Sequence, residues 1–332
     1  MREPSRILLV KPSSLGDVIH ALPVVSAIHA FWPQAELRWL IHPAWRSLVE
    51  DHPGVSGTIL FPREKFRGPA GWLRSLAWMG TLGDWRPDLA IDLQGLLRSA
   101  LFSRISGATR VIGLSDAREG AGFLYHERAV VDSKEHAVRR YLSVLKHLGI
   151  PRPEHPEFML PAGRPPEGFR IDSPYVVLHP HARGARKNLT KDHVLSFVHG
   201  AGWHRVVLVG RGERFEGLPP NVEDWTNRTD LLELTAILRG SSFTVSSDSG
   251  PMHLATALHP RKTLAIHLWS DPCKVGPYFP ESLVWKNGRV ARVSALDGSF
   301  RLEGRPPSQG EMEDLGEKAA AESRGGGGGF PV

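Results

Sequence analysis

Cysteine is almost absent from this chain. Cys273 is the only one among 332 residues. A disulfide within the chain and a metal site built from several cysteine ligands are therefore both excluded. The sequence also has no acidic Asp-x-Asp motif, which agrees with a protein that holds neither a resident metal ion nor a cofactor.

Long hydrophobic runs are absent as well. No stretch approaches the run of about 18 apolar residues that a membrane-spanning helix needs. Residues 1–10 contain two arginines and a four-residue apolar run before Lys11, which is too short for the core of a signal peptide. We therefore expect a cytoplasmic protein.

Several common binding motifs are missing too. The turn after the first predicted strand does not have the G-x-G-x-x-G spacing of a dinucleotide site, and there is no P-loop. There is also no zinc-finger spacing and no aromatic RNA-binding signature. These absences argue against a kinase or ATPase and leave nucleic-acid binding as a minor alternative.

The overall composition is that of a soluble globular protein, with 41% hydrophobic and 23% charged residues. A chain of 332 residues is long enough for two domains with substantial cores. The 41 basic residues outnumber the 35 acidic ones, which gives a net charge of +6. This excess favours an anionic partner without choosing between a nucleotide, an acidic lipid surface and a nucleic acid.

The amino-terminal half alternates between predicted strands and helices. The strands are expected at residues 6–11, 35–42, 88–94 and 110–113. Helices are expected after the first strand, where apolar residues recur in steps of three and four, and at residues 71–82, 96–105 and 136–148. Such alternation is typical of an α/β fold with a parallel sheet covered on both faces.

A proline-rich stretch at residues 150–174 interrupts this alternation and is predicted to be an interdomain linker. Beyond it, strands are expected at 175–179, 205–209, 243–247 and 262–268, and helices at 191–199, 230–238 and 251–257. We place a first domain at residues 1–160, a second at 161–290 and a tail at 291–332. The tail is expected to contain a polar helix at 309–323 and a disordered glycine-rich end. Two such halves would leave a ligand cleft between the carboxyl ends of their strands.

The most informative segment is V-S-S-D-S-G-P-M-H-L-A at residues 245–255. A strand here meets a predicted helix start, where unpaired backbone N–H groups and the positive end of the helix dipole favour a phosphate. Ser249 supplies a hydroxyl, Gly250 allows close approach, and His253 lies on the first helical turn. The alternative is a Ser/Asp helix cap with an unrelated histidine.

A second candidate site follows the first strand, at residues 11–17. Gly16 allows another backbone or a substrate to come close, and Asp17 lies at the carboxyl edge of the sheet. A carboxylate there could accept the proton of a substrate hydroxyl. The alternative is that Asp17 caps the helix that follows.

An ordered set of segments resembles the bacterial heptosyltransferases, glycosyltransferase family 9. Residues 248–255 are similar to the family's D-[ST]-G-x-x-H motif, residues 11–23 to its amino-terminal motif, and residues 92–100 to its D-x-Q-G-x-x-[RK]-S segment. Residues 230–234 and 270–272 follow in the expected order. The amino-terminal and Gln94 motifs look most like the first heptosyltransferase, which extends the Kdo–lipid A core.

The resemblance implies a GT-B fold, with two Rossmann-like domains whose parallel sheets face each other across a cleft. The first domain would bind the acceptor and the second the nucleotide sugar. It also implies an inverting, metal-independent transfer of heptose from ADP-heptose to an anionic Kdo–lipid A type acceptor at the cytoplasmic face of the inner membrane. Another nucleotide-sugar enzyme, such as an epimerase or a family 9 transferase with a different donor, and a non-catalytic protein that binds anionic lipid or nucleic acid remain as alternatives.

Matched by position, the resemblance makes Asp17 the general base and Lys187 the cation at the donor diphosphate. The residues expected at the donor are Ser13, Ser14, Gly16, Arg183, Arg186, Glu213, Asp248, Ser249, Gly250 and His253. The family's lysine is usually followed by a basic residue, Trp and Pro, whereas this chain has Asn188-Leu189-Thr190. For this reason Arg183 and Arg186 stay candidates for the diphosphate contact. At the acceptor, the resemblance points to a basic loop with Arg63, Lys65 and Arg67, and to Arg98; ordinary solvated charges are the alternative.

Overall fold

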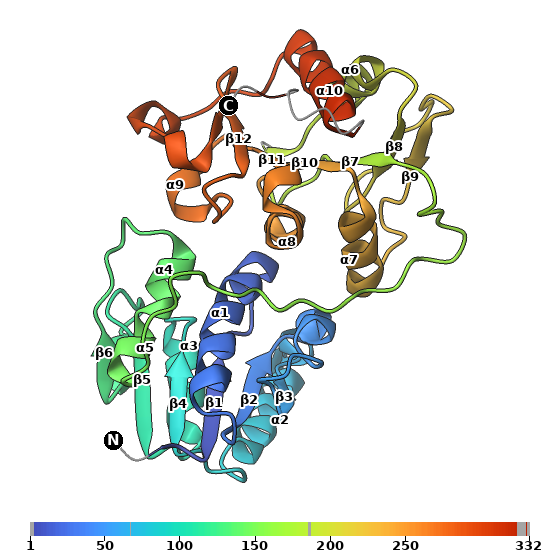
Figure 1. Cartoon of the computed structure of the whole chain (residues 1–332). Coiled ribbons are helices and arrows are strands. Elements are labelled where there is room, and N and C mark those ends of the chain that lie inside the picture. Colours follow the sequence, from blue (N-terminus) through green and yellow to red (C-terminus); the bar gives the residue numbers. More distant parts are fainter. Residues whose placement is uncertain (1–2, 67, 185–186, 324–329, 331–332) are drawn as a thin grey trace. The chain divides into compact units, whose positions relative to one another are not determined.

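The computed structural model describes residues 3–66, 68–184, 187–323 and 330, and the chain divides into two compact units, 1–161 and 162–332. Each unit is built around a mainly parallel sheet with helices on its faces (Figure 1). The two units are described separately.

The first unit follows the alternation expected from its sequence. Its elements are β1 (Arg6–Val10), α1 (Leu15–Phe31), β2 (Glu36–Ile41), η1 (Pro43–Leu48), β3 (Gly57–Leu60), η2 (Arg63–Phe66), α2 (Gly68–Thr81), β4 (Leu89–Asp92), α3 (Leu97–Ile105), β5 (Arg110–Leu114), η3 (Ala121–Leu124), β6 (Glu127–Ala129), α4 (Ala137–Leu142) and α5 (Val144–His147). The strands are all parallel, in the order β3-β2-β1-β4-β5-β6. The strand order therefore reverses between β1 and β4, the place where open α/β sheets bind ligands.

Burial explains why β1 lies at the centre of this sheet. Its four apolar residues, 7–10, are fully buried, as expected for a parallel strand covered on both faces. Leu8 and Val10 belong to the core formed with Ala100 and Phe102 of α3. Helices α1, α4 and α5 pack together as a second group (Figure 1).

The helix expected at residues 136–148 is divided into α4 and α5. The Ser143 N–H donates to the carbonyl of Arg140, three residues back, at 3.3 Å. This tighter bond ends α4 at Leu142. The short strands β3 and β6 were not expected from the sequence.

The second unit repeats the same topology. Its elements are β7 (Tyr175–His179), α6 (Lys191–Ala201), β8 (Arg205–Leu208), β9 (Val222–Asp224), α7 (Leu231–Gly240), β10 (Phe243–Ser247), α8 (Gly250–Leu258), η5 (Pro260–Lys262), β11 (Thr263–Ile266), α9 (Pro272–Val275), β12 (Leu283–Lys286), β13 (Arg289–Arg292), η6 (Val293–Ala295), η7 (Gly298–Arg301) and α10 (Gln309–Ser323). The sheet order is β13-β12-β11-β10-β7-β8-β9, and only the β12–β13 pair is antiparallel among the described strands. Here the strand order reverses between β10 and β7.

The tail differs from the sequence-based division, and one residue of the proline-rich linker packs on β7. The described residues 150–174 contain no helix or strand, but Phe169 is buried and its ring lies 5.3 Å from that of Tyr175. Residues 291–332, which the sequence pattern sets apart as a tail, belong to the second unit. The physical reason is that Met312, Leu315 and Ala319 recur on one face of α10 and are buried in the core with α6. The glycine-rich residues 325–329, expected to be disordered, lie outside the described residues.

Candidate active site

Asp17 lies at the point of strand-order reversal in the first unit, on the first turn of α1. Its Oδ2 accepts hydrogen bonds from the N–H of Ser14 at 2.8 Å and from the Ser14 hydroxyl at 2.9 Å. Its Oδ1 accepts a hydrogen bond from the Tyr141 hydroxyl at 2.8 Å and lies 3.4 Å from Lys11 Nζ. The Asp17 side chain nevertheless keeps 35% of its surface exposed. One oxygen therefore completes a capping box, while a fixed carboxylate still reaches the surface.

The charge balance around Asp17 keeps it ionised. Burial raises the pKa of Asp17, but Lys11, the Ser14 donors and the Tyr141 hydroxyl together lower it by more. The pKa of Asp17 therefore lies below its ordinary value. Burial lowers the pKa of Lys11, and Asp17 offsets part of that effect. The Lys11 ammonium also lies 4.8 Å from the centre of the Tyr141 ring. A carboxylate held this way is a proton acceptor at neutral pH.

Asp92 supports the neighbouring loop from the end of β4, where it is the strand partner of Val10. It is fully buried and accepts hydrogen bonds from the Tyr125 hydroxyl at 2.8 Å, the Ser99 hydroxyl at 2.7 Å and two backbone N–H groups of the loop. Burial raises the pKa of Asp92 against these donors. The loop residue Gln94 in turn accepts from the Ser13 N–H at 3.4 Å. Asp92 is thus a positioning group for the loop beside Asp17.

The expected donor contacts Ser13 and Ser14 lie in the first unit, next to Asp17. Gly16 is buried within the first turn of α1. These three residues belong to one turn, and the Ser14 hydroxyl already donates to Asp17. Their contact with the donor stays a prediction.

The basic residues expected at the acceptor are only partly gathered. Arg63 and Lys65 are exposed on η2. The guanidinium of Arg98 lies 5.2 Å from the centre of the Phe61 ring, and burial, followed by the charge of Arg63, lowers the pKa of Arg98. The structure therefore brings Arg98 close to Arg63, while Arg67 lies outside the described residues.

In the second unit, Lys187 and Asp248 form an ion pair at the corresponding reversal point. Lys187 follows β7 and Asp248 follows β10, and their Nζ and Oδ2 atoms are 2.6 Å apart. The Ser270 hydroxyl donates to the same Oδ2 at 2.5 Å. Burial raises the pKa of Asp248, but His267, Lys187 and Ser270 outweigh it and bring the pKa to about 2. Asp248 is therefore ionised, and its carboxylate orients the Lys187 ammonium.

Two buried groups hold Ser270. The Lys286 ammonium donates to the Ser270 carbonyl at 2.8 Å, and His267 Nδ1 lies 2.8 Å from the Ser270 hydroxyl oxygen. Burial lowers the pKa of His267 to about 4, so the ring is neutral at pH 7. These residues link the end of β11 to the Lys187–Asp248 pair.

Ser249 is the residue before α8, but its hydroxyl does not cap the helix. It lies 3.2 Å from Nδ1 of His179, whose pKa burial lowers to about 3. Gly250 begins α8, and His253 lies on its first turn, partly exposed. The Ser249 side chain therefore does not cap α8, and the anion site at this junction stays a prediction.

The remaining expected donor contacts lie on exposed loops. Arg183 and Glu213 are exposed, and Arg186 lies outside the described residues. Beside Glu213, Gly212 packs so closely on His181 that a Cβ atom would come within 2.5 Å of the ring. This loop is thus held against the loop that follows β7.

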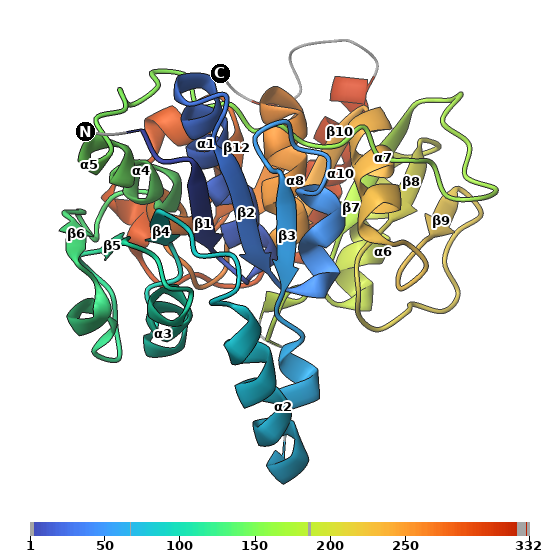
Figure 2. The same ribbon diagram turned by 90° about the horizontal axis from the view of Figure 1, so that it is seen from below.

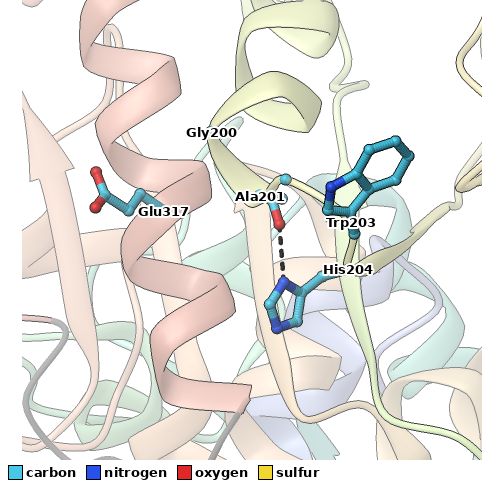
Figure 3. Close-up of a pocket in the computed structure, with 6 residues that line it drawn as sticks. Gly200, Ala201, Trp203, His204 and Glu317 are labelled. Atoms are coloured by element: carbon cyan, nitrogen blue, oxygen red, sulfur yellow. Dashed lines mark hydrogen bonds between the residues drawn. The ribbon is translucent and has the colours of Figure 1, made fainter.

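A surface hollow of about 440 Å³ lies elsewhere in the second unit, between the end of α6 and α10 (Figure 3). It is lined by Gly200, Ala201, Gly202, Trp203, His204 and Glu317. No expected site residue lines it. The described residues contain no cluster of three His, Cys, Asp or Glu that could hold a metal ion, and no helix among them is long and apolar enough to cross a membrane.

Comparison with known proteins decides the family. The sequence model of glycosyltransferase family 9 (heptosyltransferase) matches residues 76–292, more than half of the chain. The chain belongs to glycosyltransferase family 9. It is therefore a glycosyltransferase of the ADP-heptose:lipopolysaccharide heptosyltransferase family, and a non-catalytic binding protein is excluded.

Individual relatives agree with this assignment. The glycosyltransferase is 23% identical over 304 residues to the lipopolysaccharide core heptosyltransferase OpsX of Haemophilus influenzae, which covers 83% of this chain and 82% of that protein. It is 34% identical over 163 residues to lipopolysaccharide heptosyltransferase 1 of Pseudomonas aeruginosa, which covers 45% and 44% of the two chains. Its fold matches the E. coli heptosyltransferase WaaC with ADP-2-deoxy-2-fluoro heptose with a TM-score of 0.71 and 24% identity, covering 85% of this chain and 93% of that one. The predicted GT-B fold class is thereby confirmed.

Sequence reasoning missed four side chains of these sites: Lys11, Tyr141, His267 and Lys286. Tyr141 is 4% exposed. A buried tyrosine hydroxyl requires a partner, which was the available signal. For Lys286, a charged residue next to the apolar run of β12 was the corresponding signal.

Proposed function

We propose that this glycosyltransferase moves heptose from ADP-heptose to a hydroxyl of a Kdo–lipid A type acceptor, with inversion at the anomeric carbon and without a metal ion. The first unit would bind the acceptor and the second the nucleotide sugar. The protein would work as a peripheral enzyme at the cytoplasmic face of the inner membrane. WaaC, which shares the fold, has been solved with ADP and with a fluorinated ADP-heptose.

The observation that carries the proposal is the fixed, partly exposed carboxylate of Asp17. In a single displacement, the acceptor oxygen attacks the anomeric carbon while its proton passes to Asp17. The bond between that carbon and the β-phosphate oxygen breaks, and its electron pair leaves with ADP. Because the acceptor attacks the face opposite the leaving group, the anomeric configuration inverts.

The departing ADP gathers negative charge that must be offset. Lys187 has three N–H donors, and Asp248 occupies one of them at 2.6 Å. The other donors, with the N–H groups at the start of α8, Ser249, Gly250 and His253, would receive the phosphate oxygens. Arg183 and Arg186 are alternative cations for this contact, Glu213 would meet the ribose, and Arg63, Lys65, Arg67 and Arg98 would meet the anionic acceptor.

The test is ADP release from ADP-heptose with a Kdo-terminated lipid A acceptor. We expect turnover that EDTA does not reduce, a product of inverted anomeric configuration by NMR, and little use of UDP- or GDP-sugars. Preference for another nucleotide sugar would instead support a family 9 transferase with a different donor.

Asp17→Asn keeps the shape of the side chain but removes the base. We expect its kcat to fall about 10²–10⁴-fold, the usual contribution of general-base catalysis. Asp116→Asn, which alters another partly buried carboxylate of the first unit, serves as the matched control. Turnover by Asp17→Asn close to that of the unmodified enzyme would remove Asp17 from this role.

A further inference from the structure

Helix α2 of the first unit presents an apolar face to solvent. Leu73 is 62% exposed and Leu76 is 43% exposed. Ala77 and Gly80 are exposed as well, and the four positions recur in steps of three and four along one face of the helix. Exposed leucines placed side by side on one face are a feature of interaction surfaces.

The opposite face of α2 already has a partner. The Trp78 ring lies 5.3 Å from that of Phe61 and 5.1 Å from that of Phe102, and its Nε1 donates to the Leu60 carbonyl at 3.0 Å. Met79 packs against the same core. The helix is thus held by one face, so the leucines on the other face are not needed to anchor it.

Charge around this face is predominantly positive. Residues 63–81 contain four basic residues and one acidic residue, and α2 itself has no acid. Arg74, which follows Leu73 in the chain, is exposed, and Arg63 and Lys65 are exposed on the preceding turn. The one acid, Glu64, lies 3.0 Å from His42 Nε2. An apolar face bordered by cations complements an anionic lipid surface.

The position of α2 suits such a contact. Helix α2 follows the carboxyl end of β3, and Asp17 follows the carboxyl end of β1. Because β1 and β3 are parallel, α2 and Asp17 come after the same edge of the sheet. Figure 2 shows α2 extending away from the strands of its unit. The helix can therefore reach a surface without disturbing the sheet.

We propose that the exposed face of α2 (Leu73, Leu76, Ala77 and Gly80), with Arg74 and the basic turn before it, docks on a membrane that contains anionic lipid. The two leucines enter the interface and the basic side chains meet lipid phosphates. This inference rests on the proposed function, because an acceptor anchored by acyl chains is presented at such a surface.

The experiment measures binding of the full chain to vesicles without donor or acceptor, so its outcome is separate from that of the transfer assay. We expect co-sedimentation with phosphatidylcholine vesicles containing phosphatidylglycerol, weaker binding to phosphatidylcholine alone, and weaker binding as salt is raised. The double variant Leu73→Ser/Leu76→Ser should lose roughly tenfold in affinity, because the apolar surface of two half-exposed leucines is no longer transferred from water into the membrane. Arg74→Gln should reduce only the part of the binding that depends on anionic lipid.

The matched control is Ile171→Ser/Leu302→Ser, which removes two aliphatic side chains of similar exposure, 56% and 63%, from the second unit. It should bind vesicles as the unmodified chain does. Equal loss in both double variants, or no vesicle binding by the unmodified chain, would overturn the proposal. So would a dimer in sedimentation velocity that Leu73→Ser/Leu76→Ser dissociates, because a second copy would then cover this face.

Discussion

At the scale of single residues, Asp17 shows that two competing interpretations can both hold. The sequence left open whether it caps a helix or acts as a base. In the structure, Oδ2 receives the Ser14 donors and Oδ1 receives the Tyr141 hydroxyl. The cap fixes the carboxylate, and the fixed carboxylate keeps an exposed edge, so the structural role is compatible with the proposed chemical one.

Tyr141→Phe tests this arrangement through the pH dependence of turnover. The Tyr141 hydroxyl lowers the pKa of Asp17, so its removal should raise that pKa toward the ordinary value. The acidic limb of the kcat/KM profile should then move to higher pH, because Asp17 must be ionised to accept a proton. Tyr175→Phe removes a buried hydroxyl that donates to the Ile237 carbonyl in the second unit and should cost stability only. An acidic limb unchanged by Tyr141→Phe would show that the hydroxyl does not act on the base.

Lys187→Ala should mainly weaken the use of the donor. Loss of the cation removes charge stabilisation of departing ADP and leaves the Asp248 carboxylate, 9% exposed, without its ion-pair partner. We expect kcat/KM for ADP-heptose to fall about 10²-fold or more. Lys191→Ala, at the exposed start of α6, is the control. If the response to donor concentration stays the same, the role passes to Arg183 or Arg186.

At the scale of elements, the α6–α10 contact depends on two glycines. A Cβ atom on Gly316 would lie 2.0 Å from the Phe197 carbonyl oxygen, and one on Gly200 would lie 1.8 Å from that of Glu313. The helix backbones therefore touch directly. This contact explains why a helix that looks polar in sequence belongs to the core of the second unit.

Gly316→Ala should destabilise the second unit although alanine favours helix. The methyl group would force the helices apart, at a cost of about 1–3 kcal/mol in the free energy of unfolding. Gly310→Ala changes a glycine of the same helix with nothing within 4 Å of its Cβ position, so it should be neutral or slightly stabilising. Urea unfolding of the two variants measures the difference, and equal stability would contradict the close approach.

Elements were predictable where burial produces a recognisable hydrophobic pattern in the sequence. Strands β1, β7 and β10 are buried apart from Arg6 at the start of β1, and they were expected because they are mostly continuous runs of apolar or small residues. Strand β12 is an exception, because its four residues are buried and it was not expected. Among the other missed strands, β3 and β9 are short and half-buried along their length. Their formation depends on pairing with β2 and β8, which local pattern does not record.

At the scale of the whole molecule, buried neutral histidines make stability depend on pH. Burial lowers the pKa of His52 to about 4, of His179 to about 3 and of His267 to about 4. Below about pH 6.5 these histidines are protonated in the unfolded chain but stay neutral in the folded chain. Stability is therefore complete above that pH and falls as the pH drops toward 4.

We expect each of these histidines to cost about 2 kcal/mol of stability between pH 7 and pH 5. The lowered pKa values of Asp17 and Asp248 act at lower pH, because carboxylates lose their contribution only as pH falls through the folded pKa. Urea unfolding at the two pH values measures the effect. His52→Gln should reduce the pH dependence, whereas the exposed His155→Gln should not. Equal stability at both pH values would contradict the buried neutral state.

The sequence by itself determined the α/β alternation, the proline-rich linker and the two strand-to-helix junctions at Asp17 and Ser249, because burial, chain breaking and helix starts are set by neighbouring residues. Only the tertiary structure decided which groups meet there. Tyr141 lies 124 positions from Asp17, and Lys187 lies 61 positions from Asp248. The packing of α4 on α1 brings Tyr141 to Asp17. Strand order brings Lys187 to Asp248, because β7 lies beside β10 and the segments that follow these two strands share one edge of the sheet.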